Sequence, residues 1–381
     1  MFTATDPVER VALTHLRIPM KEFWPEAVAT EPQDRNAILV TLESSSGVAH
    51  GECSPMMADG RPALEACWNE LADVVAPSLL GRTVSRSEDI GALAASWSVG
   101  RLAAAGAETA LWDLLGQSHH ATVAQLLGAD EEQIAMGVPS GMALGLYPSI
   151  VELLEAIESH LVEGYRRIKI RIAPGRDLEL VRAVREHFED VPLMVDGGGS
   201  YSSADIELFR ELDDFDLLMF EQPMAADDID GLAALQQAVS TPVCLDKTAS
   251  TFEKTAEAIR RGACRIVNLK IQRVGGLGPA RAIHDLCLQS DVACWVGSTP
   301  ELGLGQAYGV HLATLANCKY PSDLEPSVRW FVDDYVSPAF EHASPGLFSV
   351  PTRPGVGFQV DLQKVHRHQI RQQEFTRTQS A

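Results

Sequence analysis

The chain has 381 residues, of which 46% are hydrophobic, and a formal net charge of −21 at pH 7. This length suits one large domain with a smaller one beside it, and the apolar content is enough for a sizeable core. So acidic a chain is a poor partner for nucleic acid or an anionic membrane, because both carry negative charge themselves.

The cysteine pattern and the N-terminus indicate a cytoplasmic protein. The seven cysteines are odd in number and form no CxxC pair, which favours reduced thiols over a disulfide framework. The first residues lack a basic stretch followed by a long apolar core, so we expect no signal peptide. No apolar run reaches the roughly 18 residues that span a bilayer.

The first 130 residues predict a mixed domain. Residues 8–55 have β character, with a hairpin that turns between Ser44 and Gly47. A long loop between the strands carries Trp24, which either closes over a substrate or packs against the base of its own loop. Three helices are predicted between residues 63 and 128. The first strand of a second domain is expected within residues 133–142.

Five short apolar runs between Ile168 and Lys270 organise the rest of the chain. Their terminal charges are 24 or 25 positions apart, and helix-like segments with apolar residues three and four apart separate them. This alternation predicts βα units and a parallel sheet whose faces are both covered. In a closed barrel, the carboxyl ends of the strands form the catalytic face. The terminal charged residues are Lys169 with Arg171, then Asp196, Glu221, Asp246 and Lys270.

Three of these charges are carboxylates, which would raise one another's pKa unless a cation neutralised them. Asp196, Glu221 and Asp246 offer only oxygen ligands, and this favours Mg²⁺ or a similarly hard ion over zinc. Any one of them is equally ordinary as a helix cap. Three at equal pitch, flanked by lysines, favour a metal site.

The region after Lys270 contains further candidates. The paired glycines at 275–276 suit a close backbone turn near a ligand. Residues 292–298 predict the seventh strand, which places Ser298 and Glu301 near the pocket, although Glu301 is as ordinary as a helix-entry residue. An eighth strand should end near residues 323–325. The stretch from 346 has β and turn character and returns to the first domain, and the polar, basic chain after Leu362 is expected to fray.

Short motifs along the whole chain carry a family resemblance: ALWDLLGQ (110–117), KIR (169–171), VDGG (195–198), EQP (221–223), LDK (245–247), NLK (268–270), RVGGL (273–277) and PGVGFQVD (354–361). These motifs resemble those of the enolase superfamily, within it the muconate lactonizing enzyme subgroup, and most of all its o-succinylbenzoate synthase and N-succinylamino acid racemase group. The resemblance implies a (β/α)₇β barrel of the α/β class, residues 131–345. It also implies an N-terminal α+β capping domain, residues 1–130, which the C-terminal segment 346–381 joins.

The resemblance also implies a reaction, a cofactor and a partner class. Enzymes of this family remove a proton α to the carboxylate of a small substrate and are often homo-oligomers. By this resemblance Lys270 is the acid/base, Lys169 and Arg171 assist electrostatically, and the three carboxylates hold Mg²⁺ or Mn²⁺. Stabilising the charge that develops as the proton leaves requires fixed positive partners in a water-poor site.

Three positions depart from the family pattern. Arg171 stands where a second lysine is usual, and a guanidinium with a pKa above about 12 is a poor base, so two-base racemisation is disfavoured. Gly198 replaces an asparagine. Lys247 replaces an acidic residue, and it either pairs with Glu221 or Glu301, contacts the substrate, carries a proton or points outward. The segment GSTPELG (297–303) also differs, which indicates an altered substrate.

Two classes of function are therefore compared. The first is a lyase or isomerase of the o-succinylbenzoate synthase or N-acylamino acid racemase type. The alternative is a metal-binding, catalytically impaired homologue that acts as a small-molecule binding protein. A third, weaker interpretation takes Gly197–Gly199 as a phosphate cradle, but the chain lacks the glycine-rich segment expected after strand eight.

Overall fold

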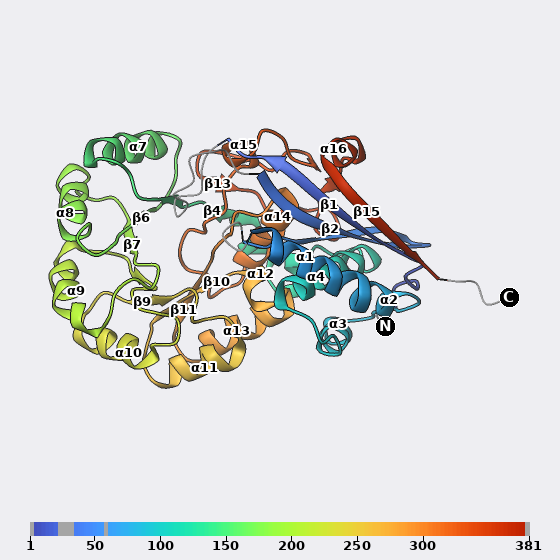
Figure 1. Ribbon diagram of the computed structural model, residues 1–381, viewed down its shortest axis with the longest axis horizontal. Coiled ribbons are helices and arrows are strands. Elements are labelled where there is room, and N and C mark those ends of the chain that lie inside the picture. Colours follow the sequence, from blue (N-terminus) through green and yellow to red (C-terminus); the bar gives the residue numbers. More distant parts are fainter. Residues whose placement is uncertain (1–3, 22–33, 57–59, 378–381) are drawn as a thin grey trace.

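The computed structural model describes residues 4–21, 34–56 and 60–377 (Figure 1). Its N-terminal part contains a four-stranded antiparallel sheet in the order β15-β1-β2-β3. Ser44 pairs with Gly47, which confirms the predicted hairpin. Trp24 lies outside the described residues. The four strands are β1 (Arg10–Pro19), β2 (Asp34–Ser44), β3 (Gly47–Cys53) and β15 (Gln369–Thr376).

Helices cover one face of this sheet, and the longest, α4 (Arg101–Ser118), packs closely on β3. Small residues permit this approach, since a Cβ added at Gly106 would lie 2.6 Å from the Cβ of Cys53. Within the described chain no helix is long and apolar enough to cross a membrane. The other helices of this part are α1 (Gly60–Glu70), α2 (Ala76–Leu79), α3 (Ser87–Ala95), α5 (Val123–Leu127) and α6 (Glu131–Met136), with a π-helical turn at Leu71–Val75.

Seven parallel strands follow one another in sequence order, β5 to β11, with helices on their outer side (Figure 1). Burial on both faces explains their apolar sequences. The strands are β5 (Met142–Leu144), β6 (Ile168–Arg171), β7 (Leu193–Asp196), β8 (Phe220–Glu221), β9 (Val243–Leu245), β10 (Ile266–Leu269) and β11 (Ala293–Val296). The helices are α7 (Ile150–Val162), α8 (Leu178–His187), α9 (Ile206–Leu212), α10 (Ile229–Ala238), α11 (Phe252–Arg260), α13 (Leu277–Gln289) and α14 (Gly303–Ala313).

The segment 317–323 closes this sheet into a barrel. On one side Lys319 N donates to Cys294 O at 2.9 Å, and on the other Ser322 N donates to Pro139 O at 2.9 Å. The predicted (β/α)₇β class is therefore confirmed. Inside the barrel, directly below the charged strand ends, lies a buried cluster of Met194, Met219, Cys244, Ile266 and Trp295.

Two local predictions were wrong. Residues 131–136 form helix α6 where a strand was expected, because Asp130 and Gln133 make a capping box that starts a helix. The chain does not fray after Leu362 but forms α16 (Leu362–His368), which Asp361 caps, and then β15, whose backbone pairs with β1. The boundaries at 130 and 346 remain predictions. The remaining elements are α12 (Ile271–Val274), α15 (Ser327–Trp330), β4 (Val138–Pro139), β12 (Val336–Ser337), β13 (Leu347–Phe348) and β14 (Gln359–Val360).

Buried carboxylates of the N-terminal part bind the N-termini of barrel helices. Glu52 accepts hydrogen bonds from Leu302 N at 2.9 Å and Gly305 N at 3.0 Å, at the start of α14. Glu108 accepts from Leu277 N at 2.8 Å and Gly278 N at 2.7 Å, at the start of α13. These amides have no partner within their own helices, so an acid from elsewhere both satisfies them and meets the positive end of the helix dipole.

Replacing Glu108 with alanine should lower the free energy of unfolding by about 2–4 kcal/mol, because buried amide donors lose their acceptor. Burial raises the pKa of Glu108 to about 7, from 4.5. A carboxyl with a raised folded pKa contributes stability that is complete below its unfolded pKa and is lost as the pH rises through the folded one. In denaturant titrations, the difference in unfolding free energy between Glu108→Ala and the native protein should therefore become smaller from about pH 5 to about pH 8.

The control for this prediction is Glu88→Ala, because the Glu88 side chain is 72% exposed. It should change stability by less than about 0.5 kcal/mol. A loss at Glu108 no larger than the loss at Glu88 would contradict the docking role.

Candidate active site

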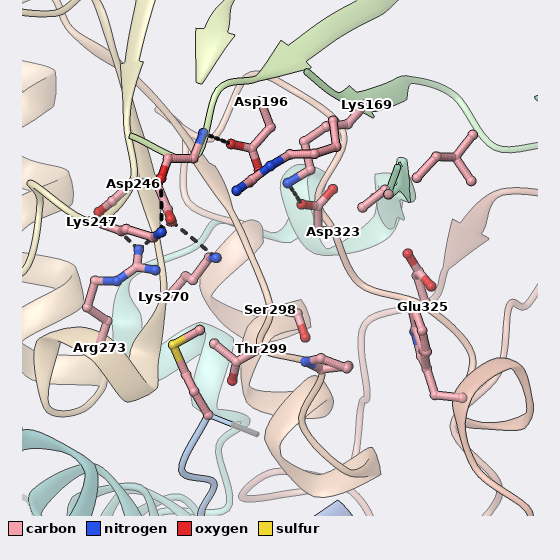
Figure 2. Close-up of a pocket in the computed structure, with 18 of the residues that line it drawn as sticks. Lys169, Asp196, Asp246, Lys247, Lys270, Arg273, Ser298, Thr299, Asp323 and Glu325 are labelled. Carbon is pink, nitrogen blue, oxygen red and sulfur yellow. Dashed lines mark hydrogen bonds and ion pairs between the residues drawn. The ribbon is translucent and has the colours of Figure 1, made fainter. Parts of the chain in front are cut away.

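The cationic residues predicted to be catalytic lie on opposite sides of the barrel mouth. Lys169 and Arg171 belong to β6, and Lys270 directly follows β10. Three strands separate β6 from β10 on one side, and β11, the closing segment and β5 separate them on the other. All three side chains line one pocket (Figure 2). A small molecule bound there would lie between them.

The three predicted metal-ligand carboxylates come from adjacent strands. Asp196 ends β7 and pairs in register with Glu221 at the end of β8, while Asp246 directly follows β9. Asp196 and Asp246 line the pocket, whereas Glu221 lies beneath it and is only 1% exposed. The equal pitch in the sequence therefore does bring these strand ends together.

Each of these carboxylates is in contact with a cationic side chain of the protein. Arg171 Nη1 lies 3.0 Å from Asp196 Oδ2, and Lys169 Nζ lies 3.0 Å from Glu221 Oε2. Lys270 Nζ lies 3.1 Å from Asp246 Oδ1. Two further residues join this cluster. Arg273 also pairs with Asp246 Oδ1, and Asn268 Nδ2 donates to Glu221 Oε1 at 2.7 Å and to Asp246 Oδ1 at 3.2 Å.

The electrostatics of the cluster separate the two lysines by role. Burial lowers the pKa of Lys169, but the carboxylates of Asp323, at 2.5 Å, and Glu221 outweigh burial and raise the pKa above its usual range. Lys169 therefore stays an ammonium and cannot accept a proton. Burial raises the pKa of Asp246, but Arg273 and Lys270 outweigh it and hold that pKa below its usual range.

The donor chemistry of the site fits a hard divalent ion, because the three strand-end carboxylates offer only oxygen. The three carboxylates are not gathered around one point, as metal ligands would be. In the described ranges no three Asp, Glu, His or Cys side chains are gathered closely enough to hold a metal ion. The carboxylates are instead balanced by lysine and arginine side chains. A divalent ion at this site would have to share the carboxylates with these cations.

The four predicted substrate-binding residues have different outcomes. Lys247 lines the pocket, where its Nζ donates to Gly198 O at 3.1 Å, and Ser298 also lines the pocket. Glu301 does not line it. The Glu301 carboxylate accepts from Ser298 Oγ at 2.5 Å and from Thr299 N at 3.0 Å, so it orders the loop behind the pocket. Trp24 lies outside the described residues.

Sequence reasoning gave no role to Asn268, Arg273, Asp323 or Glu325, although all four lie in or beside the site. The signal for Asn268 was available, since it lies two residues before Lys270 on one strand and therefore shares its face. Asp323 and Glu325 were recognised only as the end of the eighth strand. Arg273 reaches Asp246 from the helical turn after Lys270, which strand periodicity does not reveal.

The paired glycines at 275–276 do not line the pocket. Gly276 has a φ of +135°, and a Cβ added there would collide with the carboxyl group of Glu108. The turn therefore needs glycine so that Glu108 can reach the start of α13. The preceding α12 carries Arg273, whose carbonyl accepts from Arg101 Nε at 2.7 Å. The N-terminal part thus fixes the turn that presents Arg273 to the pocket.

Comparison with known proteins identifies the family. The family description "Enolase C-terminal domain-like" matches residues 152–365, and "Mandelate racemase / muconate lactonizing enzyme, N-terminal domain" matches residues 13–128. The chain therefore belongs to the enolase superfamily and is an enzyme of its lyase and isomerase class.

Its relatives include an o-succinylbenzoate synthase from Geobacillus stearothermophilus, 35% identical over 98% of this chain and 99% of that protein. An N-succinylamino acid racemase from Amycolatopsis sp. is 35% identical over 91% of this chain and 93% of that protein. Among solved structures, a member of the enolase superfamily from Listeria innocua is 30% identical and superposes with a TM-score of 0.89, covering 97% of this chain and 99% of that one.

Proposed function

We propose that this protein is a Mg²⁺-dependent enzyme that removes the proton α to the carboxylate of a small substrate. The observation that carries the proposal is the placement of Lys270 across the barrel mouth from Lys169 and Arg171, with carboxylates on the strand ends between them. A proton carrier on one side and fixed cations on the other are what abstraction of a weakly acidic proton needs.

Lys270 Nζ accepts the α-proton. It is the pocket lysine at the end of β10, and its partner Asp246 Oδ1 is shared with Arg273 and Asn268. Lys169 stays charged between Asp323 and Glu221, so it acts by its positive charge. Arg171 cannot give up its proton and does the same. The site thus has one base, which suits a β-elimination or one-sided proton exchange better than racemisation by two bases.

Members of this superfamily generally use Mg²⁺. Asp196, Glu221 and Asp246 would hold it here. When bound, Mg²⁺ supplies positive charge that stabilises the substrate as its α-proton leaves. The chain's own residues bind and orient the substrate, and the buried apolar cluster beneath the site excludes water from the barrel interior.

The substrate class follows from the relatives and from this pocket. The names of two relatives, o-succinylbenzoate synthase and N-succinylamino acid racemase, point to substrates that carry carboxylates. Five cationic and four acidic side chains line this pocket, and a bound Mg²⁺ would add positive charge, which favours an anionic substrate. The cations are Lys169, Arg171, Lys247, Lys270 and Arg273. The altered loop at 297–303 supports a substrate different from those of the relatives.

Proton NMR in D₂O tests this function. With Mg²⁺ present, the native protein should remove the α-proton signal of at least one compound among N-acyl amino acids, dipeptides and succinylbenzoate precursors. EDTA should stop the exchange, and added Mg²⁺ should restore it. With Lys270 as the single base and Lys247 taking no part in proton transfer, one enantiomer should exchange with retention, at least about 100-fold faster than it racemises.

A second result would favour the impaired homologue. If the native protein exchanges the α-proton of no compound and Arg171→Lys does exchange one, the native site binds small molecules without turning them over. Equal rates of exchange and racemisation would contradict the single-base mechanism, because a second proton carrier would then be needed.

A further inference from the structure

Arg171 and Lys247 both contact Gly198, in the turn that follows Asp196. Arg171 lies against Gly198, and Lys247 Nζ donates to Gly198 O at 3.1 Å. Figure 2 shows Lys247 beside Asp246.

Gly198 leaves the space that Arg171 occupies. Its φ is +56°, and a Cβ added there would overlap the Arg171 guanidinium group. Arg171 is the far end of a flexible side chain, so a larger residue at 198 would displace the guanidinium rather than the backbone. Gly199 is also left-handed, with a φ of +83°, but its added Cβ would meet Met224 O only at 3.3 Å.

This arrangement determines which groups contact the Asp196 carboxylate. Arg171 Nη1 lies 3.0 Å from its Oδ2, and Gly198 N donates to its Oδ1 at 2.8 Å. Both oxygens are therefore engaged by the same local arrangement. The hydrogen bond from Lys247 to the Gly198 carbonyl holds this turn in place across the gap to the segment after β9.

We propose that Arg171, Gly198 and Lys247 form one unit that holds Asp196 in an ion pair, with Gly198 as the positioning residue for Arg171. A divalent cation then binds at Asp196 only in competition with Arg171, because the two share a carboxylate and repel each other. This proposal concerns the ground state of the site and does not depend on which reaction the enzyme performs.

A double-mutant cycle tests the unit, with Gly198→Ala and Arg171→Ala alone and together. The readouts are Mn²⁺ affinity, from electron paramagnetic resonance, and the thermal unfolding midpoint without metal. Arg171→Ala should raise Mn²⁺ affinity about tenfold, because it removes a competing positive charge. Gly198→Ala should raise it several-fold in the native background and leave it unchanged in the Arg171→Ala background. Gly199→Ala is the control, and it should leave the Mn²⁺ affinity of each background unchanged.

The thermal readout keeps the test independent of metal binding and of activity. Gly198→Ala should lower the unfolding midpoint more in the native background than in the Arg171→Ala background, where the guanidinium is absent. If Gly198→Ala folds only in the Arg171→Ala background, the unit is likewise supported. Equal effects of Gly198→Ala in both backgrounds, failure to fold in both, or effects matched by Gly199→Ala would overturn it.

Discussion

Replacing Lys270 with alanine is expected to slow α-proton exchange by at least about 10³-fold, while the protein stays folded. Lys270 Nζ is held at the pocket by Asp246 Oδ1 at 3.1 Å. A Cβ added at Gly297, directly after β11, would lie 2.8 Å from Lys270 Cε, so the backbone there packs closely against the Lys270 side chain. Of the other cations near it, Arg273 is a guanidinium and a poor base, and Lys247 Nζ is directed at the Gly198 carbonyl, 3.1 Å away.

Deuterium exchange by NMR measures the effect, with Lys254→Ala as the control. Lys254 lies exposed on α11, outside the barrel mouth, so its removal should leave exchange within about twofold of native. Added methylamine should restore part of the lost rate in Lys270→Ala, since a small amine can enter the space and accept the proton. Exchange in Lys270→Ala within tenfold of native would mean that another group is the base.

The charged strand ends were predictable because a parallel barrel has simple periodicities. A residue two positions along a strand shares its face, and βα units of equal length place each strand end at the same rim. Five charged residues lie at strand ends of equal spacing and therefore face the same rim of the barrel. They are Lys169, Asp196, Glu221, Asp246 and Lys270. These residues alone predict a parallel βα sheet with its charges at one rim, whereas the (β/α)₇β class was implied by the resemblance and several pocket residues, such as Arg273 and Asp323, were not predicted.

The pairing of charges at that rim could not be predicted. Arginine and lysine have several rotatable bonds, so strand position gives the face on which Arg171 lies but not its ion pair with Asp196. Three acids on adjacent strand ends need positive charge to balance them, and the sequence indicates a divalent cation for this. The structure shows that lysine and arginine can supply the balance. Contacts over long separations, such as Glu108 with Gly278, also leave no periodic signal.

Replacing Lys169 with methionine should cause the largest loss of stability, about 3–5 kcal/mol near neutral pH, because it breaks a buried ion-pair network. Lys169 is 7% exposed and lies between Glu221 Oε2 at 3.0 Å and Asp323 Oδ2 at 2.5 Å. Its Nζ also stands 5.2 Å from the centroid of the Trp295 ring. Methionine has a similar length, so the change removes the charge with little loss of volume.

The pH dependence identifies the cause of that loss. Arg167 and Lys169 overcome burial and hold the pKa of Asp323 below its usual range, so Asp323 contributes stability above its unfolded pKa and loses it as the pH falls. Without Lys169 this contribution shrinks, and Glu221 and Asp323 protonate more readily. In denaturant titrations, the difference in unfolding free energy between the native protein and Lys169→Met should therefore become smaller as the pH falls from about 7 to about 4.

A partner substitution separates lost charge balance from lost packing. In Lys169→Met/Glu221→Gln, one of the two carboxylates that lost their ammonium partner is replaced by a neutral amide. The double variant should therefore lose at least about 1 kcal/mol less unfolding free energy than the sum of the two single losses. Lys254→Met, a surface lysine, should cost less than about 0.5 kcal/mol. If Lys169→Met loses no more than that, or loses the same at every pH, the ammonium does not balance these acids. The barrel would then tolerate the carboxylates without it, and the case for Lys169 as a fixed electrostatic group would fail.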